Sequence, residues 1–293
     1  MSVVESSGFS IYYEVIGPDD GRPLVLIAGL AEQIGSVEYP DAQCESFIDR
    51  GFRVVRMDNR DSGLSVPLAP VGVVDLDQVG ELLASGEMLA APPYTRRDMA
   101  ADVVAVLDAL GIDQADLIGA SMGGYIGREV AASFPERVSA LTVVMSGSGA
   151  STGDNGPQLG AGLISGLAEM ARPRPRGEMI ELLVQQWRWL WGPHYSGDAA
   201  WLRDRISAAF ARGHHPEGIA RQVTGGVLSP GLWDRQRSIG CPTLVIHGDH
   251  DPVFGVDHAV AVAERIPRAQ LWVDPHMGHV MHREQWPEMA DRV

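Results

Sequence analysis

The sequence predicts an α/β fold: a doubly wound, mostly parallel sheet with a helical cap inserted between two of its strands. Two observations indicate this. Short apolar runs alternate with helical patterns along most of the chain, and the alternation stops over residues 150–239 before it resumes. Strands that alternate with helices are typical of a parallel sheet covered on both faces. We therefore assign residues 1–149 and 240–293 to the core of the fold and residues 150–239 to the cap.

The individual elements are predicted from hydrophobic periodicity. Residues 9–15 alternate between apolar and polar side chains, whereas residues 23–28 form a continuous apolar run, typical of a strand buried on both faces. Residues 96–110 have apolar side chains at helical spacing, after Thr95 and Asp98 in an imperfect capping box. Further strands are expected at 52–57, 115–119, 138–145, 242–247 and 269–273, and further helices at 41–50, 122–134 and 256–266. The segment 66–93 has only a weak pattern.

The composition limits the partners and the chemistry. The 293 residues are 45% hydrophobic, enough for the core of one globular domain with an insertion. A net charge of -15 would repel phosphate backbones and anionic lipid surfaces, so we expect neither a nucleic acid nor a membrane partner. The chain has no lysine, which excludes a P-loop lysine and a pyridoxal Schiff base. A neutral or cationic small molecule suits this charge best.

The cysteines and the N-terminal residues favour a cytoplasmic location. Cys44 and Cys241 are far apart in the sequence and lack the spacing of zinc ligands, which indicates buried thiols rather than a disulfide. Residues 1–15 lack the basic start and the continuous apolar run of a signal peptide. No stretch reaches the roughly 18 apolar residues of a membrane-spanning helix.

A glycine-flanked serine, Ser121, lies between a predicted strand and a predicted helix. Gly119 and Gly123 stand two positions before and after it. In a strand-turn-helix elbow the serine is strained, and side chains at those two positions would clash. A serine buried in an ordinary turn would not require them, so we expect Ser121 to be a nucleophile. Ser151 has the same flanking glycines, but the residues after it are rich in Gly, Asn and Pro and cannot begin a helix.

A histidine base must follow the serine in the chain, because all nine histidines lie at or beyond position 194. Two neighbouring strands, 242–247 and 269–273, are followed by loops that carry carboxylates and histidines. Both loops are expected at the carboxyl edge of the sheet, where ligands bind. We expect Asp251 to be the acid and His279 the base.

Other residues of these loops are alternatives for the same roles. Asp251 is preferred to Asp249 because it stands third after a glycine and precedes a proline that stiffens the loop. Hydrogen bonds to loop amides are the simpler role for Asp249. His279 follows a glycine, whereas His276 and His282 are expected to be loop and surface residues.

The same residues also invite interpretation as a metal site. The candidate ligands are His276, His279 and His282, together with His247, Asp249, His250 and Asp251. A metal site would leave the serine elbow without a purpose, and no His-Glu-x-x-His motif is present. We therefore expect no metal.

Taken together, these motifs resemble the α/β-hydrolase superfamily over nearly the whole chain, and the cap is the least similar part. The matching runs are residues 26–30, 58–65, 119–124, 248–252 and 278–279. Within the superfamily the chain is similar to bacterial esterases related to aclacinomycin methylesterase, which share the Asn-Arg-Asp-x-Gly-x-Ser and Ala-Ser-Met-Gly-Gly runs. The resemblance implies an α/β-hydrolase fold, a triad of Ser121, Asp251 and His279, and no cofactor.

The resemblance also implies an oxyanion hole formed by the backbone N–H groups of Leu30 and Met122. Many relatives have His-Gly after the early strand, where this chain has Ala28-Gly29. The donors are backbone groups, so this departure need not remove one. Residues 58–65 are implied to be structural support beside the pocket.

The activity implied is hydrolysis of a carboxylic ester through an acyl-enzyme, with a methyl ester or lactone of a bulky hydrophobic small molecule as substrate. Relatives with the same triad cleave carbon-carbon bonds or form peracids, and the sequence does not separate these activities. The alternative from another class is a ligand receptor that keeps the fold and the triad but signals through its cap.

Tryptophans of the cap are candidates for binding the substrate, because their side chains offer large apolar surfaces. The candidates are Trp187, Trp189, Trp191 and Trp201. The first three alternate along the sequence, so a helix spreads them around its circumference and only one or two face a ligand. The alternative is that all four pack in the core of the cap.

Overall fold

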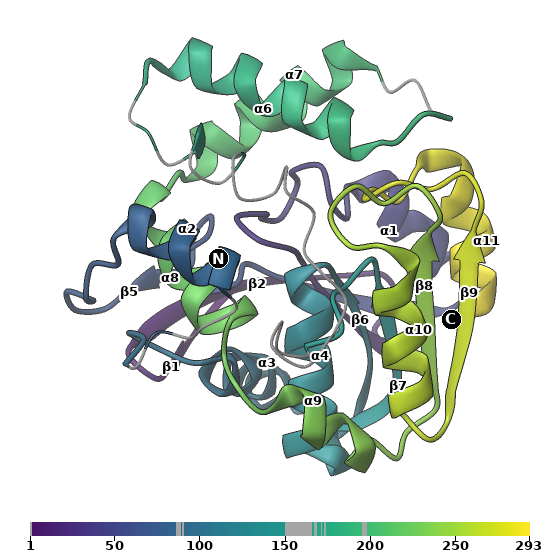
Figure 1. The fold of residues 1–293 in the computed structure, drawn as a ribbon. Helices are drawn as coiled ribbons and strands as arrows, with labels where there is room; N and C mark the ends of the chain where they lie inside the picture. Colours follow the sequence, from purple (N-terminus) through teal and green to yellow (C-terminus); the bar gives the residue numbers. More distant parts are fainter. Residues whose placement is uncertain are drawn as a thin grey trace.

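One sheet of nine strands runs through the described part of this computed structural model, which is residues 2–85, 89, 91–149, 166, 169–170, 172, 174–194 and 198–293. Its strands are β1 (Ser2–Ser6), β2 (Phe9–Ile16), β3 (Arg22–Ile27), β4 (Phe52–Met57), β5 (Val66–Pro67), β6 (Ala115–Ala120), β7 (Val138–Val144), β8 (Thr243–Gly248) and β9 (Ala269–Asp274). Their order is β1-β2-β4-β3-β6-β7-β8-β9, and β5 pairs with β2 (Figure 1). The pairs β4–β3, β3–β6, β6–β7, β7–β8 and β8–β9 are parallel, whereas β2 pairs antiparallel with β1, β4 and β5. The predicted mostly parallel sheet is confirmed.

The continuous apolar run of β3 has a direct structural cause. Successive side chains of a strand point to opposite faces of a sheet. Leu24 and Leu26 belong to one hydrophobic core, whereas Val25 and Ile27 belong to the other. Because both faces are buried, every position of the strand is apolar.

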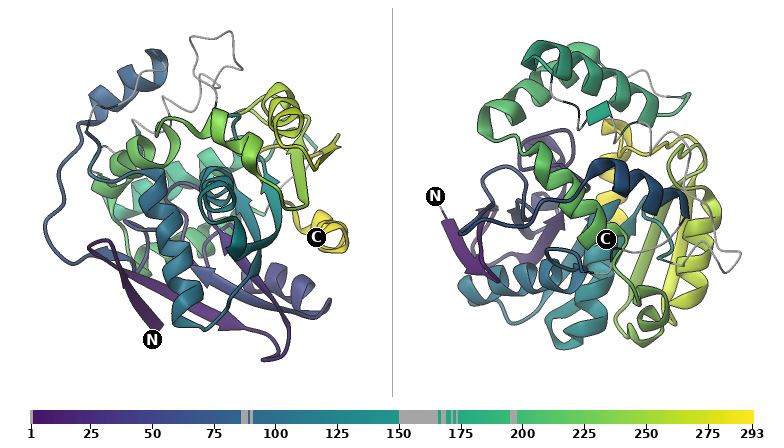
Figure 2. Two further views of the ribbon diagram at one scale, coloured as in Figure 1. Left: turned by 90° about the horizontal axis from the view of Figure 1, so that it is seen from below. Right: turned by 60° about the vertical axis from the view of Figure 1, so that its left-hand side comes forward.

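Helices cover both faces of the sheet, as Figures 1 and 2 show. The core on one face includes side chains of α3 (Arg96–Ala109), α4 (Met122–Ser133) and α10 (Val256–Arg265). The core on the other face includes side chains of α1 (Asp41–Ile48) and α11 (Trp286–Arg292). The helices therefore wind around the sheet on both sides, as expected for a doubly wound fold.

The helix α3 begins as its sequence predicts. Thr95 is the N-cap residue, and its side chain accepts a hydrogen bond from the Asp98 N–H while the Asp98 carboxylate accepts one from the Thr95 N–H. This reciprocal capping box satisfies two backbone donors that a helix start otherwise leaves unpaired.

Two helices between β7 and β8, α6 (Arg176–Leu190) and α7 (Ala199–Arg212), lie across one end of the core (Figure 1). Together with α8 (Pro216–Gln222), which follows them in the chain, we call them the cap helices. A hydrophobic cluster joins α6 and α7 through residues such as Val184 and Leu202. After a π-helix at Val223–Val227, the short helix α9 (Leu232–Arg235) contacts α4 of the core.

Three elements, β1, β5 and α2, appear where the sequence pattern is weak, and β5 (Val66–Pro67) lies at the start of the segment 66–93. The strand β1 precedes the first predicted strand, and its edge position leaves three of its five residues exposed, so its hydrophobic signal is small. The helix α2 (Leu76–Ser85) lies within the weakly patterned segment 66–93. No helix within the described ranges is long and apolar enough to cross a membrane.

Substituting Gly123 with alanine tests how closely α4 approaches the neighbouring strand. A Cβ at Gly123 would overlap the carbonyl oxygen of Ile27, which is backbone and cannot move freely. We expect Gly123→Ala to lower the melting temperature and the activity together. The control is Gly177→Ala in α6, because a Cβ at Gly177 meets no atom within 4 Å; alanine favours a helix by about 1 kcal/mol relative to glycine. Thermal unfolding checks both variants, and an equal effect at the two positions would contradict the tight approach.

Candidate active site

The site forms where two neighbouring central strands end. In the sheet, β3 pairs with β6 in parallel, so that Ile27 lies beside Gly119. The chain after β3 leads to Leu30, and the chain after β6 leads directly into Ser121. In α/β proteins, ligands bind at the carboxyl edge of the parallel sheet, where neighbouring strands such as these end.

Ser121 occupies a strained turn between β6 and α4. Its backbone has φ 52° and ψ -115°, a conformation that residues other than glycine rarely adopt. The flanking glycines fit this turn, because a Cβ at Gly119 would overlap the carbonyl oxygen of Gly123. The sequence pattern at 119–123 therefore corresponds to a real steric requirement. The second match to the pattern, Ser151, lies outside the described residues.

Ser121, His279 and Asp251 form a continuous chain of hydrogen bonds. The Ser121 Oγ lies 3.0 Å from the His279 Nε2, and the His279 Nδ1 lies 2.7 Å from the Asp251 Oδ2. The three residues come from three separate loops, after β6, β8 and β9. This is the arrangement of a nucleophile, a general base and an acid that orients the base.

The Asp251 carboxylate is held by its own loop. Its Oδ1 accepts hydrogen bonds from the N–H groups of Val253 and Phe254, at 2.8 and 2.9 Å. Burial alone would raise the pKa of Asp251, but the His279 ring, its hydrogen bond, His247 and the Phe254 amide outweigh burial and lower the pKa. Asp251 is therefore an anion that can stabilise a positive charge on His279.

A second buried histidine, His247, lies against the same carboxylate. Its Nε2 donates to the Phe254 carbonyl oxygen at 2.8 Å and lies 3.5 Å from the Asp251 Oδ2. Burial lowers the pKa of His247. The hydrogen bond joins His247, near the end of β8, to Phe254, in the loop that carries Asp251.

The remaining loop residues lie away from this chain of hydrogen bonds. Asp249 and His276 are exposed. His282 differs from the expectation of a surface residue: it is buried, its Nε2 lies 3.1 Å from the Trp191 carbonyl oxygen, and burial lowers its pKa to about 4. In the described ranges, no three His, Cys, Asp or Glu side chains stand close enough together to hold a metal ion.

The two backbone groups expected to form the oxyanion hole stand beside Ser121. Met122 follows it at the first position of α4, and Leu30 follows β3, the neighbouring strand. In the described part of the chain, neither N–H donates a hydrogen bond to another protein group. Both donors are therefore available to a negative charge that develops near Ser121.

Side chains from distant parts of the sequence hold the loop that carries Leu30. Glu38 accepts a hydrogen bond from the Gly29 N–H, Gln222 of α8 accepts one from the Ala31 N–H, and Asn59 donates one to the Ala28 carbonyl oxygen. Asn59 lies in the segment 58–65, which the sequence motifs imply to be structural support, whereas the sequence does not single out Glu38 or Gln222. Gln222 is 191 positions from its partner, and no local pattern indicates such a contact.

Buried ion pairs join the cap helices to the segment 58–65. Arg221 forms two hydrogen bonds with Asp61, at 2.7 and 2.8 Å, and Tyr94 donates a third to the same carboxylate. Arg212 pairs with Asp58. These ion pairs thus attach α7 and α8 to the segment 58–65.

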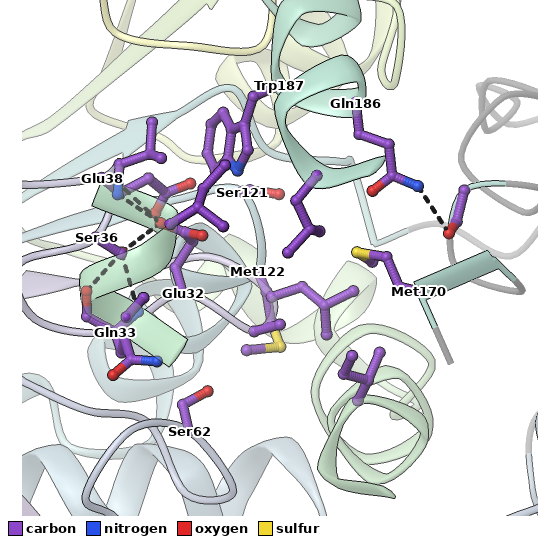
Figure 3. A pocket seen from close by; sticks show the side chains of 18 of the residues that line it. Glu32, Gln33, Ser36, Glu38, Ser62, Ser121, Met122, Met170, Gln186 and Trp187 are labelled. Atoms are coloured by element: carbon purple, nitrogen blue, oxygen red, sulfur yellow. Dashed lines mark hydrogen bonds between the residues drawn. The ribbon is translucent and has the colours of Figure 1, made fainter. Parts of the chain in front are cut away.

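A cavity of about 220 Å³ opens onto Ser121 and His279. Its apolar wall includes Leu183, Leu190, Phe210, Ile219, Val223 and Val253, from both the cap helices and the core. Figure 3 shows Ser121 with Met122 and Trp187 around this space, and Glu32 and Glu38 on one side of it.

The four cap tryptophans lie in different places. Trp187 and Trp189 line the cavity, with Trp187 buried and Trp189 exposed over 44% of its surface. Trp191 and Trp201 are not among the residues that line it. Trp191 is buried near His282, and Trp201 packs against the hydrophobic cluster between α6 and α7. Of the three tryptophans that alternate along the sequence, Trp187 and Trp189 thus line the cavity and Trp191 does not.

Comparisons with known proteins find relatives along nearly the whole chain. Rhodomycin D methylesterase from Streptomyces sp. (strain C5) is 31% identical over 291 residues, covering 93% of this chain and 89% of that protein. The structure of an esterase from Exiguobacterium antarcticum matches with a TM-score of 0.73 at 19% identity, covering 99% of this chain and 97% of that one. The enol-lactonase from Burkholderia xenovorans LB400 matches with a TM-score of 0.71 at 20% identity, with the same coverage.

The family assignment follows from the length of the match. The family model of the alpha/beta hydrolase fold matches residues 22–284, which is most of the chain. The resemblance inferred from the sequence motifs is confirmed. The chain belongs to the alpha/beta hydrolase fold family.

Proposed function

We propose that this protein is a serine hydrolase that cleaves a carboxylic ester through an acyl-enzyme on Ser121. The observation that carries the proposal is the hydrogen-bonded chain of Ser121, His279 and Asp251 at the wall of a cavity. The likeness to a rhodomycin D methylesterase over 93% of the chain supports an ester as the bond that is broken.

In the first step, the Ser121 Oγ attacks the ester carbonyl carbon while His279 takes the hydroxyl proton at Nε2. Asp251 accepts the Nδ1–H of the ring, which fixes the tautomer and stabilises the imidazolium that forms. The carbonyl oxygen becomes an oxyanion, and the N–H groups of Leu30 and Met122 donate to it. When the carbon-oxygen bond breaks, the alcohol leaves with the proton from His279.

In the second step, water hydrolyses the acyl-enzyme along the same route. His279 takes a proton from the water as its oxygen attacks the acyl carbon, and then returns a proton to the Ser121 Oγ. The acid is released and the triad is restored. Apart from the ester and the water, every group in these steps is a side chain or a backbone N–H of this chain.

The walls of the cavity favour a hydrophobic substrate. Apolar side chains of the cap and the core enclose the space over Ser121, and Trp187 adds a large flat surface. We infer that residues 150–239 act as a cap over the site and that the substrate is a small-molecule ester with a bulky apolar group, a methyl ester or lactone among the candidates. The net charge of -15 supports such a partner rather than a nucleic acid or a membrane, and the free thiols of Cys44 and Cys241 support a cytoplasmic location.

Substrate size provides a test of the cavity. We expect kcat/KM to rise with the size of the apolar group until the cavity is full, by about 0.8 kcal/mol per buried methylene. Trp187→Ala should lower kcat/KM for the largest esters by about ten-fold and leave acetate esters nearly unchanged, because a large apolar group buries more surface against the cavity wall than an acetyl group does.

Trp201→Ala is the matched control, because Trp201 belongs to the same cap but does not line the cavity. The measurement is kcat/KM over esters of increasing acyl and alcohol size, with thermal unfolding to show that both variants keep their cap. A preference for acetate esters that neither substitution alters would contradict the pocket assignment.

The proposed function itself is tested by labelling and turnover. Fluorophosphonates react with activated serines, so the wild-type protein should be labelled and should cleave members of a panel of methyl esters, aryl esters and lactones. If the protein is labelled but cleaves none of the panel, the ester assignment is wrong. If it is not labelled at all, the activated nucleophile is wrong.

A further inference from the structure

Two carboxyl groups, Glu32 and Glu38, line the cavity beside Ser121 (Figure 3). Within the described ranges neither forms an ion pair. Glu38 is only 7% exposed. A carboxyl group buried without a cation is costly when it is ionised, so its presence next to a proposed oxyanion hole requires an explanation.

The Glu38 side chain is in direct contact with the loop that carries Leu30. Its Oε2 accepts a hydrogen bond from the Gly29 N–H at 2.7 Å. A Cβ at Gly29 would lie 2.8 Å from the Glu38 Oε1 and 3.3 Å from the Ser121 Cβ, so the carboxyl group and the serine flank the same residue. The Gly29 carbonyl oxygen accepts the Glu32 N–H at 3.4 Å, so both polar groups of Gly29 are held. The next N–H along the chain is that of Leu30.

An ionised Glu38 would oppose the reaction that the site is built for. The oxyanion forms beside Ser121, and a like charge a few ångströms away in a cavity of low dielectric constant repels it strongly. Only the neutral carboxylic acid can hold Gly29 without this penalty.

We propose that Glu38 is a positioning residue that acts as a neutral carboxylic acid. By accepting the Gly29 N–H, it directs the neighbouring Leu30 N–H toward the oxyanion. When Glu38 ionises, acyl transfer slows. This inference rests on the proposed function in one respect, the identity of the Leu30 N–H as an oxyanion donor.

The surroundings of Glu38 support the neutral form. Burial raises the pKa of Glu38 well above its usual range, the charge of Glu32 raises it further, and the Gly29 hydrogen bond lowers it only in part. Tyr39, the other titratable neighbour in this loop, is buried, and the charge of Glu38 contributes to its raised pKa. Across the cavity, the titratable groups among the described residues are Asp61, Tyr125, His214, His215 and His279. Asp61 is paired with Arg221, and burial raises the pKa of Tyr125.

Of the two carboxyl groups, Glu32 is the one that ionises at the lower pH. Its Oε2 accepts hydrogen bonds from the Ser36 hydroxyl and from the N–H groups of Val37 and Glu38. Burial raises the pKa of Glu32, and these three donors lower it, whereas Glu38 has one such donor. As the pH rises, Glu32 therefore ionises first and its charge keeps Glu38 protonated.

Three variants separate positioning from a merely structural role. Glu38→Gln mimics the neutral acid, because its amide oxygen can still accept the Gly29 N–H. Glu38→Leu removes the acceptor at similar volume. Glu32→Gln removes the neighbouring charge, and Glu45→Gln is the control at an exposed position of α1.

The measurement is kcat and KM from pH 6 to 9 with an ester that the wild type cleaves, together with the rate of fluorophosphonate labelling. In the wild type, both rates should fall on the alkaline side. Glu38→Gln should keep kcat at neutral pH within about two-fold and lose the alkaline fall, whereas Glu38→Leu should lower kcat by about ten-fold or more with little change in KM. Glu32→Gln should move the fall to lower pH, and Glu45→Gln should behave as the wild type.

Thermal unfolding tests the state of Glu38 without any substrate. A carboxyl group whose pKa in the folded protein is above its ordinary value of 4.5 stabilises the fold below that value, and this contribution is lost as the pH rises through the folded-state pKa. Glutamine has no such dependence. The melting temperature of Glu38→Gln should therefore rise relative to the wild type as the pH increases from 5 to 8.

The two readouts keep this inference distinct from the proposed function. If the wild type cleaves no ester, the function fails, and labelling rates and melting temperatures still decide the role of Glu38. An alkaline fall that persists in Glu38→Gln, a Glu38→Leu variant with wild-type kcat, or a difference in melting temperature that is constant with pH would overturn the inference.

Discussion

Ser121→Ala should abolish ester turnover and fluorophosphonate labelling while the protein stays folded. The members of a triad act as a unit, and loss of the nucleophile lowers kcat by about a million-fold in a serine hydrolase. His279→Ala should have a similar effect, because it removes the base that lies 3.0 Å from the Ser121 Oγ. Steady-state kinetics and labelling measure the loss, and thermal unfolding shows that the fold remains.

The second serine with flanking glycines provides the control for this experiment. Ser151 matches the same short pattern but is followed by residues that cannot begin a helix. Ser151→Ala should therefore be labelled and turn over substrate as the wild type does. Labelling that survives in Ser121→Ala and disappears in Ser151→Ala would reverse the assignment.

Asp251→Asn should lower kcat by about 10³ to 10⁴. The Asp251 Oδ2 accepts the Nδ1–H of His279, and an amide NH₂ at that position favours the tautomer in which Nε2 carries the proton. The Nε2 then cannot take the proton of Ser121. The other oxygen can still accept the N–H groups of Val253 and Phe254, so the loop should keep its shape.

Asp249→Asn is the matched control, two residues away in the same loop. Asp249 is exposed, and its side chain makes no hydrogen bond to His279 in the described part of the chain. Its substitution should change kcat by less than about three-fold, since it leaves the histidine tautomer unchanged. A larger loss at Asp249 than at Asp251 would show that the acid had been misassigned.

The parts of the molecule that the sequence predicts are those with a local physical cause. The strand at 23–28 is recognisable because burial on both faces makes every position apolar. The elbow is recognisable because the turn at Ser121 excludes side chains at Gly119 and Gly123. The helix at 96–109 begins at a capping box formed within four consecutive residues.

The parts that the sequence does not predict depend on contacts between distant residues. Glu38 and Gln222 hold the same loop, yet Gln222 reaches Ala31 across 191 positions and only the fold brings them together. The direction of each cap tryptophan depends on how α6 and α7 pack, so periodicity alone cannot select Trp187 over Trp191. Edge strands such as β1 escape detection because exposure removes their hydrophobic signal.

The central claim is that acyl transfer proceeds through a covalent bond to Ser121, and the trapped acyl-enzyme tests it most directly. Because the chain has no lysine, trypsin cleaves it only after arginine, and residues 98–128 form one peptide with Ser121 as its single serine. The wild type is mixed with an ester that it cleaves, quenched in acid within the first turnover, digested and analysed by mass spectrometry. We predict that this peptide gains the mass of the acyl group and that it does not in Ser121→Ala. An acyl group on any other peptide, or turnover with no acylated peptide at any quench time, would contradict the account.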